Sequence, residues 1–265
     1  MRIRRGIAIR APAVMIAALV LAPKPGSAQT DEIQVYDAGI AETRKFNLTW
    51  HNNFTPEGAA TPAFPGALVA DKSLNGVTEW AYGAADWFEA GLYLPLYSIG
   101  KRTANRGASA MVDGFKIRLL FVAPHADGRT FFYGVNFEFS DNRRHWDRAR
   151  FTSEVRPIVG WHLRRVDIVV NPIVDTAYDG LKNLDFAPAT RVAYNWTKTW
   201  ATAFEEYDDF GPVHRFRPAR EQSHQLYGVI DYSSKRLNVQ AGVGLGLTHG
   251  SDRWTLKLIV SRDLN

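Results

Sequence analysis

The chain has 265 residues, 46% of them hydrophobic, with 32 basic and 27 acidic side chains and no cysteine. Five of the basic residues and no Asp or Glu fall within residues 1–28, so residues 29–265 carry 27 charges of each sign. This balance gives no support to a nucleic-acid partner, and the lack of cysteine excludes disulfides, thiol catalysis and cysteine metal sites.

The start of the chain has the pattern of an export signal. Four arginines lie in the first ten residues, and an apolar stretch runs from Ala11 to Ala22. That stretch is shorter than the roughly twenty residues that span a bilayer. Small residues precede Gln29, so we expect a signal peptide over residues 1–28 that is cleaved between Ala28 and Gln29. Residues 29–42 are expected to form an N-terminal periplasmic segment or a plug.

From residue 43 to 265 the side chains alternate between apolar and polar, most clearly along residues 236–247. The alternation predicts strands at 43–53, 74–84, 86–97, 112–123, 130–139, 150–162, 165–174, 186–196, 199–207, 221–232, 236–247 and 253–263. Most are about ten residues long, which a tilted strand needs to cross hydrocarbon. We therefore predict an all-β fold, namely a closed antiparallel up-and-down transmembrane β-barrel of about twelve strands. A secreted soluble barrel or sandwich is the alternative.

The predicted connections alternate in length, which favours a barrel in the outer membrane of a Gram-negative bacterium. The long ones, at 54–73, 98–111, 140–149, 175–185 and 208–220, would be extracellular. The tight ones would be periplasmic, together with both termini. Four tryptophans on the apolar side of their strands lie beside tight turns and would form an interfacial girdle: Trp80, Trp161, Trp196 and Trp200.

If the apolar side faces lipid, the lumen receives charged residues of both signs. The candidates are Glu79, Glu89, Lys116, Arg118, Glu138, Glu154, Arg156, Arg165, Asp167, Arg191, Glu205, Asp231 and Lys257. They would form either a lattice of ion pairs that fills a narrow barrel or the walls of a small aqueous passage. Glycines at 242, 244 and 246 would either widen that passage or relieve strain where the barrel bends.

Other features of the loops point to lipid contact or, more weakly, to catalysis. Basic residues gather at 101–106, 143–148 and 214–220, and in the last two segments arginines stand beside an aromatic residue, a composition that suits lipopolysaccharide phosphates. His249 and Ser251 resemble the histidine and serine of outer-membrane phospholipases, and Asp208 and Asp209 with His214 resemble an omptin-type site. No metal-ligand or phosphate-loop motif occurs, so neither a metal nor a cofactor is expected.

The aromatic strand Glu79–Gly83 and the following stretch Asp86–Pro95 resemble a hairpin of a broad group of bacterial outer-membrane transporters. That group includes proteins associated with the meta-pathway of phenol degradation, and the resemblance implies uptake or efflux of small molecules. The chain departs from many such barrels in ending with Leu264 and Asn265 instead of an aromatic residue.

These patterns predict a narrow pore or transporter for a small-molecule solute, without enzymatic activity. A structural or surface-interaction barrel with a closed charged lumen is the alternative, and a lipid or lipopolysaccharide hydrolase is the second alternative. The expected partners are outer-membrane lipid, lipopolysaccharide and the barrel assembly machinery.

Overall fold

The computed structural model describes residues 32–102 and 107–264. The predicted signal peptide, its cleavage site at Ala28 and Gln29, and Arg106 lie outside the described residues. Apart from two short 3-10 turns, at Ala126–Gly128 and Leu181–Asn183, the regular structure of the described part is β-sheet. No helix in that part is long and apolar enough to cross a membrane.

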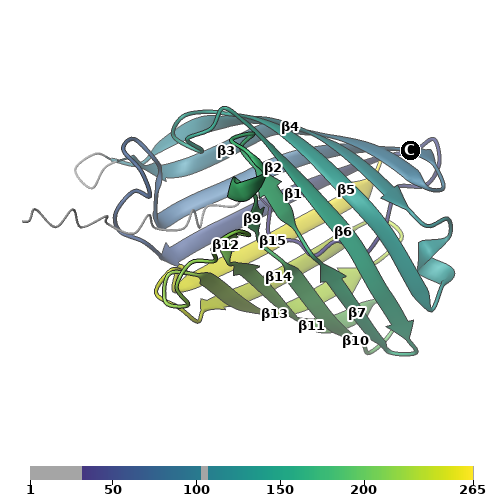
Figure 1. Cartoon of the computed structure of the whole chain (residues 1–265). Helices are drawn as coiled ribbons and strands as arrows, with labels where there is room; N and C mark the ends of the chain where they lie inside the picture. The colour runs from purple at the N-terminus through teal and green to yellow at the C-terminus, as the bar shows by residue number, and fades with distance from the viewer. Residues whose placement is uncertain (1–31, 103–106, 265) are drawn as a thin grey trace, which may run out of the picture.

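The described strands form one closed antiparallel sheet (Figure 1). The first six are β1 (Phe46–Glu57), β2 (Val69–Ala85), β3 (Phe88–Lys101), β4 (Ser109–Val122), β5 (Phe131–Asn142) and β6 (Phe151–Leu163). The others are β7 (Val166–Asn171), β8 (Val174–Thr176), β9 (Asp185–Phe186), β10 (Ala189–Asn195), β11 (Trp200–Asp209), β12 (Gly211–Pro212), β13 (Ser223–Ser233), β14 (Asn238–Gly246) and β15 (Trp254–Asp263). Strands β1 to β6 pair in chain order, β6 pairs with both β7 and β8, and β10 joins β7 to β11, which is followed by β13, β14 and β15. The short strands β8, β9 and β12 pair in that order beside β6, and β15 pairs with β1 to close the ring.

Within this ring β7 and β8, β9 and β10, and β11 and β12 are the two parts of single interrupted strands, which makes a twelve-stranded barrel over the described residues. Pro172 interrupts the first pair and Pro188 the second, because proline has no N–H to donate to the ladder. The predicted all-β barrel of about twelve strands is therefore confirmed.

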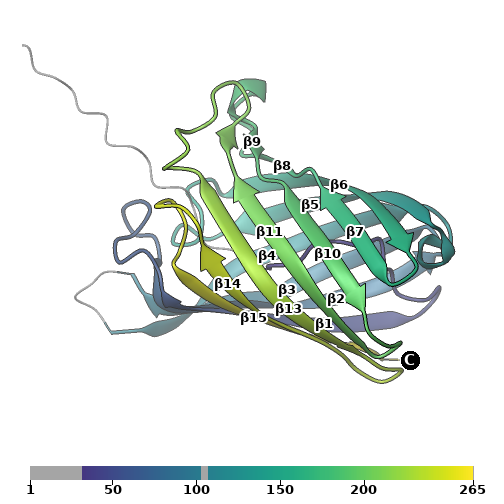
Figure 2. The same cartoon turned by 90° about the horizontal axis from the view of Figure 1, so that it is seen from below.

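The connections gather at two ends of the barrel (Figures 1 and 2). The loop end carries the connections at 58–68, 143–150, 177–184, 213–222 and 247–253 together with the described residues 102, 107 and 108, and the turn end carries those at 86–87, 123–130, 164–165, 196–199 and 234–237. The start of β1 and the end of β15 lie together at the turn end, where Leu264 N donates to Phe46 O over 2.9 Å.

The outer surface of the barrel is apolar along the strands. Side chains such as Ile117, Phe204 and Val243 are exposed there, whereas polar side chains such as His51, Glu138 and Lys257 are buried. This is the reverse of a soluble protein, and it is the pattern expected when lipid surrounds the sheet. The four predicted girdle tryptophans are exposed and close to the turn end: Trp80, Trp161, Trp196 and Trp200.

The described start of the chain, residues 32–41, lies inside the ring of strands (Figure 1). Val35, Tyr36 and Ala38 pack against inward side chains of the barrel wall, among them Phe132 and Ile158. Asn171 binds the main chain of Tyr36 in two places, since its Oδ1 accepts from Tyr36 N at 2.7 Å and its Nδ2 donates to Tyr36 O at 3.0 Å. Main-chain groups that would otherwise be unsatisfied inside the barrel are thus paired with the wall.

Candidate functional site: the barrel interior

Antiparallel strands alternate their side chains between the two faces of the sheet, so every second residue of each strand enters the lumen. Of the predicted lumen residues, all but Arg165 and Asp167 meet in three hydrogen-bonded networks. We name them by a central residue: the Arg118 network, the Glu138 network and the Glu205 network.

The Arg118 network joins β2, β3 and β4. The Arg118 guanidinium lies 2.5 Å from Glu79 and also binds Glu89, and all three side chains are buried. His51 Nε2 lies 3.2 Å from the other oxygen of Glu79. Glu89 Oε2 accepts from Ala41 N at 2.6 Å, so this network also holds the N-terminal segment.

The Glu138 network joins β4, β5 and β6. Glu138 lies 3.4 Å from Lys116 and accepts from Asn136 at 2.9 Å. On β6, Arg156 binds Glu154 through two contacts of 2.6 and 3.0 Å. Arg156 also donates to Gln34 O at 3.0 Å and lies over the Tyr36 ring, 4.4 Å from its centroid.

The Glu205 network lies on the other side of the lumen, on β10, β11, β13 and β15. Glu205 binds both Arg191 and Lys257, and Arg191 also binds Asp231. Lys257 Nζ donates to Gln240 Oε1 at 2.7 Å and to Ile33 O at 3.2 Å. In each network an ionised side chain has oppositely charged and hydrogen-bonding partners, which is what allows charges to be buried.

The remaining two predicted residues lie elsewhere. Asp167 is half-buried near the turn end, where it contacts His162 Nδ1 at 2.7 Å and accepts from Asn195 Nδ2 at 2.6 Å. Arg165 does not point into the lumen: it is exposed in the turn between β6 and β7 and reaches Tyr194 Oη at 3.5 Å. Alternation no longer fixes the facing of a residue once the chain leaves the strand.

Sequence reasoning missed several buried aromatic residues of the lumen. Tyr93 and Tyr227 are fully buried, and Tyr93 Oη lies 2.6 Å from Tyr36 Oη. A Cβ added at Gly244 would lie 2.3 Å from the Tyr227 ring, so this glycine makes room for a side chain of the neighbouring strand. The expectation that the glycines either widen a passage or relieve a bend is corrected at this position.

A cavity of about 490 Å³ lies inside the loop end of the barrel. Its lining includes Glu32 and Gln34 of the N-terminal segment, Lys116 and Arg156 of the Glu138 network, and Trp146 of the 143–150 loop. Charged and aromatic side chains therefore meet here in a volume that suits a small solute.

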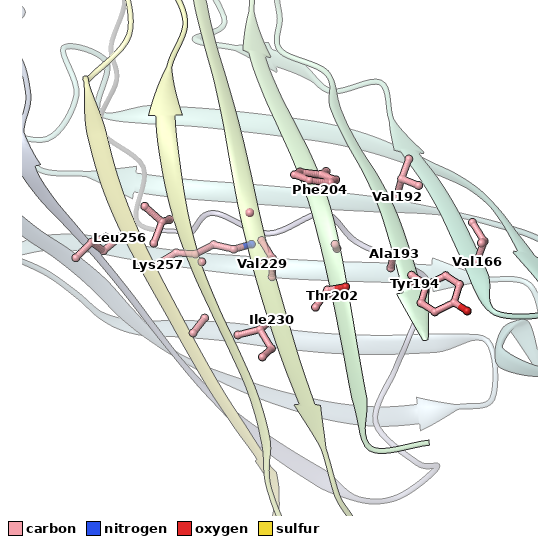
Figure 3. Close-up of a pocket in the computed structure, with 15 residues that line it drawn as sticks. Val166, Val192, Ala193, Tyr194, Thr202, Phe204, Val229, Ile230, Leu256 and Lys257 are labelled. Atoms are coloured by element: carbon pink, nitrogen blue, oxygen red, sulfur yellow. The ribbon is translucent and has the colours of Figure 1, made fainter. Parts of the chain in front are cut away.

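A larger hollow, of about 840 Å³, lies on the outer face of β7, β10, β11, β13, β14 and β15 (Figure 3). Outward apolar side chains surround it, among them Val192, Phe204 and Ile230, each of which is exposed. The exposed Gly228 leaves open space between them. Lipid chains suit such a surface, and the polar groups that could recognise a solute lie in the inner cavity instead.

Residues of the two predicted catalytic groupings, His249 with Ser251 and Asp208 and Asp209 with His214, make hydrogen bonds to other residues. Ser251 Oγ donates to His224 O at 2.9 Å, accepts from His224 N at 2.8 Å and lies 2.8 Å from Thr248 Oγ1. Asp208 binds His224 at 2.5 Å, not His214, whose Nδ1 contacts Lys182 O. Asp209 binds Arg217 at 2.6 Å. Ser251 and Asp208 thus both contact His224, which belonged to neither predicted grouping, and these contacts tie loops to strands.

No family model matches the chain, and no curated protein matches it. Among solved structures, an outer-membrane channel from Pseudomonas putida F1 is similar with a TM-score of 0.61 and 12% identity, covering 88% of this chain and 100% of that one. The KdgM porin bound to disordered oligogalacturonate has a TM-score of 0.52 and 8% identity, covering 83% and 99%. The NanC porin has a TM-score of 0.52 and 8% identity, covering 83% and 100%.

At these identities the similarity establishes the fold, which this chain shares with bacterial channel and porin barrels. The closed ring and its apolar outer surface agree with that fold, since a sheet inside a membrane has to pair all of its main-chain groups. The chain is a β-barrel of the outer membrane of a Gram-negative bacterium.

Proposed function

We propose that the protein is a narrow channel for small polar solutes and that residues 32–41 plug its lumen. The observation that carries the proposal is the polar interior itself: a charged cavity lies inside an apolar outer wall, with the N-terminal segment bound across the lumen next to it. A barrel of about twelve strands leaves a lumen narrow enough for one chain segment to fill.

The orientation follows the general rule for such barrels, in which the longer connections are extracellular. The cavity then faces the cell exterior, and the start of β1 and the end of β15 lie in the periplasm. The N-terminal segment therefore enters the lumen from the periplasmic side. Cleavage of the signal peptide after Ala28 would leave a short mature extension before Glu32. The proposed channel function is also supported by the structurally similar barrels with channel and porin names and by the resemblance of the 79–95 hairpin to outer-membrane transporters.

Single-channel recording in planar bilayers tests the proposal on two proteins, the mature chain and a variant that lacks residues 32–41. We expect small, discrete current steps from the mature chain and larger steps from the variant, because the deletion removes Val35 and Tyr36 from the lumen. Both proteins are first checked for boiling-dependent migration on a denaturing gel, which reports a folded barrel.

Other outcomes identify the part that fails. Equal conductance of the two folded proteins would support the channel function and refute the proposal that residues 32–41 plug the lumen. Two electrically silent barrels would favour the second candidate, a structural barrel with a closed lumen. The observation behind that candidate is the dense pairing of the three networks, which together with the N-terminal segment fills much of the interior.

A further inference from the structure

The cavity at the loop end carries more acid than base. Eight carboxylates and four Lys or Arg side chains line it among the described residues. Each basic group has a partner at hand: Lys116 lies beside Glu138, Arg156 binds Glu154, and Arg217 binds Asp209. Arg148, at the rim, donates to Ala63 O at 3.3 Å. The acidic groups of the lining therefore outnumber its own basic groups, and of the others Asp208 binds His224, which lies outside the lining.

Glu32 is the clearest uncompensated group. Its side chain lines the cavity and the residue is only 7% exposed, yet neither carboxylate oxygen has a hydrogen-bond partner among the described residues, 32–102 and 107–264. Buried polar groups in native proteins nearly always have partners, and an unpaired buried carboxylate is costly. The main chain beside Glu32 is anchored to the barrel wall, because Ile33 O accepts from Lys257 and Gln34 O accepts from Arg156.

Apolar and aromatic surface lies around the same cavity. Ile33 and Ile173 line it from the N-terminal segment and the barrel wall, and Phe64 and Trp146 line it from two loops. Trp146 is itself buried. Apolar side chains do not bind a metal ion, whereas they can contact the hydrocarbon part of an organic molecule. Aromatic rings also attract cations.

We propose that this cavity binds a small organic cation, an amine whose ammonium group pairs with Glu32 and whose apolar body contacts Phe64 and Trp146. Asp175, on β8, supplies a second carboxylate to the lining. This inference rests on the proposed channel function and names the class of solute that the channel admits.

The test uses the mature protein in detergent and three probes of nearly the same shape: 2-phenylethylamine as the cation, 2-phenylethanol as the neutral analogue and phenylacetate as the anion. Calorimetry should show saturable binding of the amine, and binding of the alcohol and the anion about tenfold weaker or more, since a hydrogen bond to a charged group contributes about that factor. Glu32→Gln should weaken amine binding by a similar factor. The matched control, Asp179→Asn, removes an exposed loop carboxylate outside the cavity and should leave binding unchanged.

Equal amine binding by the native protein and Glu32→Gln, or equal binding of the amine and the alcohol, would overturn the proposal. Binding of Mg²⁺ without binding of the amine would overturn it in favour of a metal ion. Both variants must keep the boiling-dependent gel shift of the native barrel. A barrel that conducts but does not bind the amine refutes this inference alone, whereas Glu32-dependent binding by an electrically silent barrel refutes the channel and keeps the site.

Discussion

At the scale of single residues, the interior relies on arginines that each compensate two acids. Arg118 binds Glu79 and Glu89, and Arg191 binds Glu205 and Asp231. The guanidinium suits this role because it presents five N–H donors in a rigid plane. Removal of one such arginine leaves two buried carboxylates facing each other without their shared partner.

We therefore expect Arg118→Met to lower the free energy of unfolding by about 3–5 kcal/mol, the usual cost of breaking a buried ion pair. The measurement is urea unfolding of the barrel in lipid vesicles, followed by tryptophan fluorescence. The control is Arg150→Met, since the Arg150 pair with Asp141 has an arginine side chain that is 68% exposed and should be worth less than about 1 kcal/mol. Equal losses in the two variants would show that the Arg118 network does not stabilise the barrel.

Sequence alternation predicted that most of these charged residues face the lumen, because a charge on the lipid face is costly, and Glu138 and Lys257 are indeed buried. It did not identify Tyr93 or Tyr227 as lumen residues. Tyrosine has an apolar ring and a polar hydroxyl, so the residue type alone does not predict whether its side chain faces lipid or a polar interior. The pairing of particular acids with particular bases depends on strand register around the closed ring, which no local pattern contains.

At the scale of elements, the strand positions could be predicted well because the alternation persists over ten or so residues in each. The ends at the loop side could not. β2 begins at Val69 rather than at the predicted residue 74, and its pairing with β3 shifts register between these two residues. Lys72, in between, has a φ of 58°. Such an irregularity breaks the apolar–polar pattern, and the pairing with β3 continues on either side of it.

The sequence did not decide whether the N-terminal segment lies in the periplasm or plugs the barrel, because the residues that anchor it come from strands far away in the chain. Asn171 holds the main chain of Tyr36 at both its N–H and its C=O. Asn171→Leu removes both hydrogen bonds, so we expect the segment to loosen and the single-channel current to rise and become noisier. Asn195→Leu is the control, since Asn195 binds Asp167 near the turn end instead of the segment. An unchanged current in Asn171→Leu would mean that packing alone holds the segment in place.

At the scale of the whole molecule, the two faces of one closed sheet differ, because the outer face contacts lipid and the inner face encloses a polar interior. The outer surface carries exposed apolar side chains at mid-strand, such as Phe204 and Val243, and exposed tryptophans near the turn end. The inner surface carries the charged networks and the cavity. Closure by β15 on β1 joins the long strands into a ring, so the same strands can separate lipid from a polar interior.

This arrangement predicts that the cost of a charge on the outer face depends on its depth. Val243 is exposed on the outer face near the middle of β14, and Leu237 is exposed at the turn that precedes the same strand. Val243→Arg should lower the free energy of unfolding by about 2–4 kcal/mol and Leu237→Arg by about 1 kcal/mol or less, because the penalty is largest at the bilayer midplane. Urea unfolding in vesicles gives both values. If the two substitutions cost the same, Val243 does not lie deeper in hydrocarbon than Leu237, and the assignment of the membrane belt to mid-strand would be wrong.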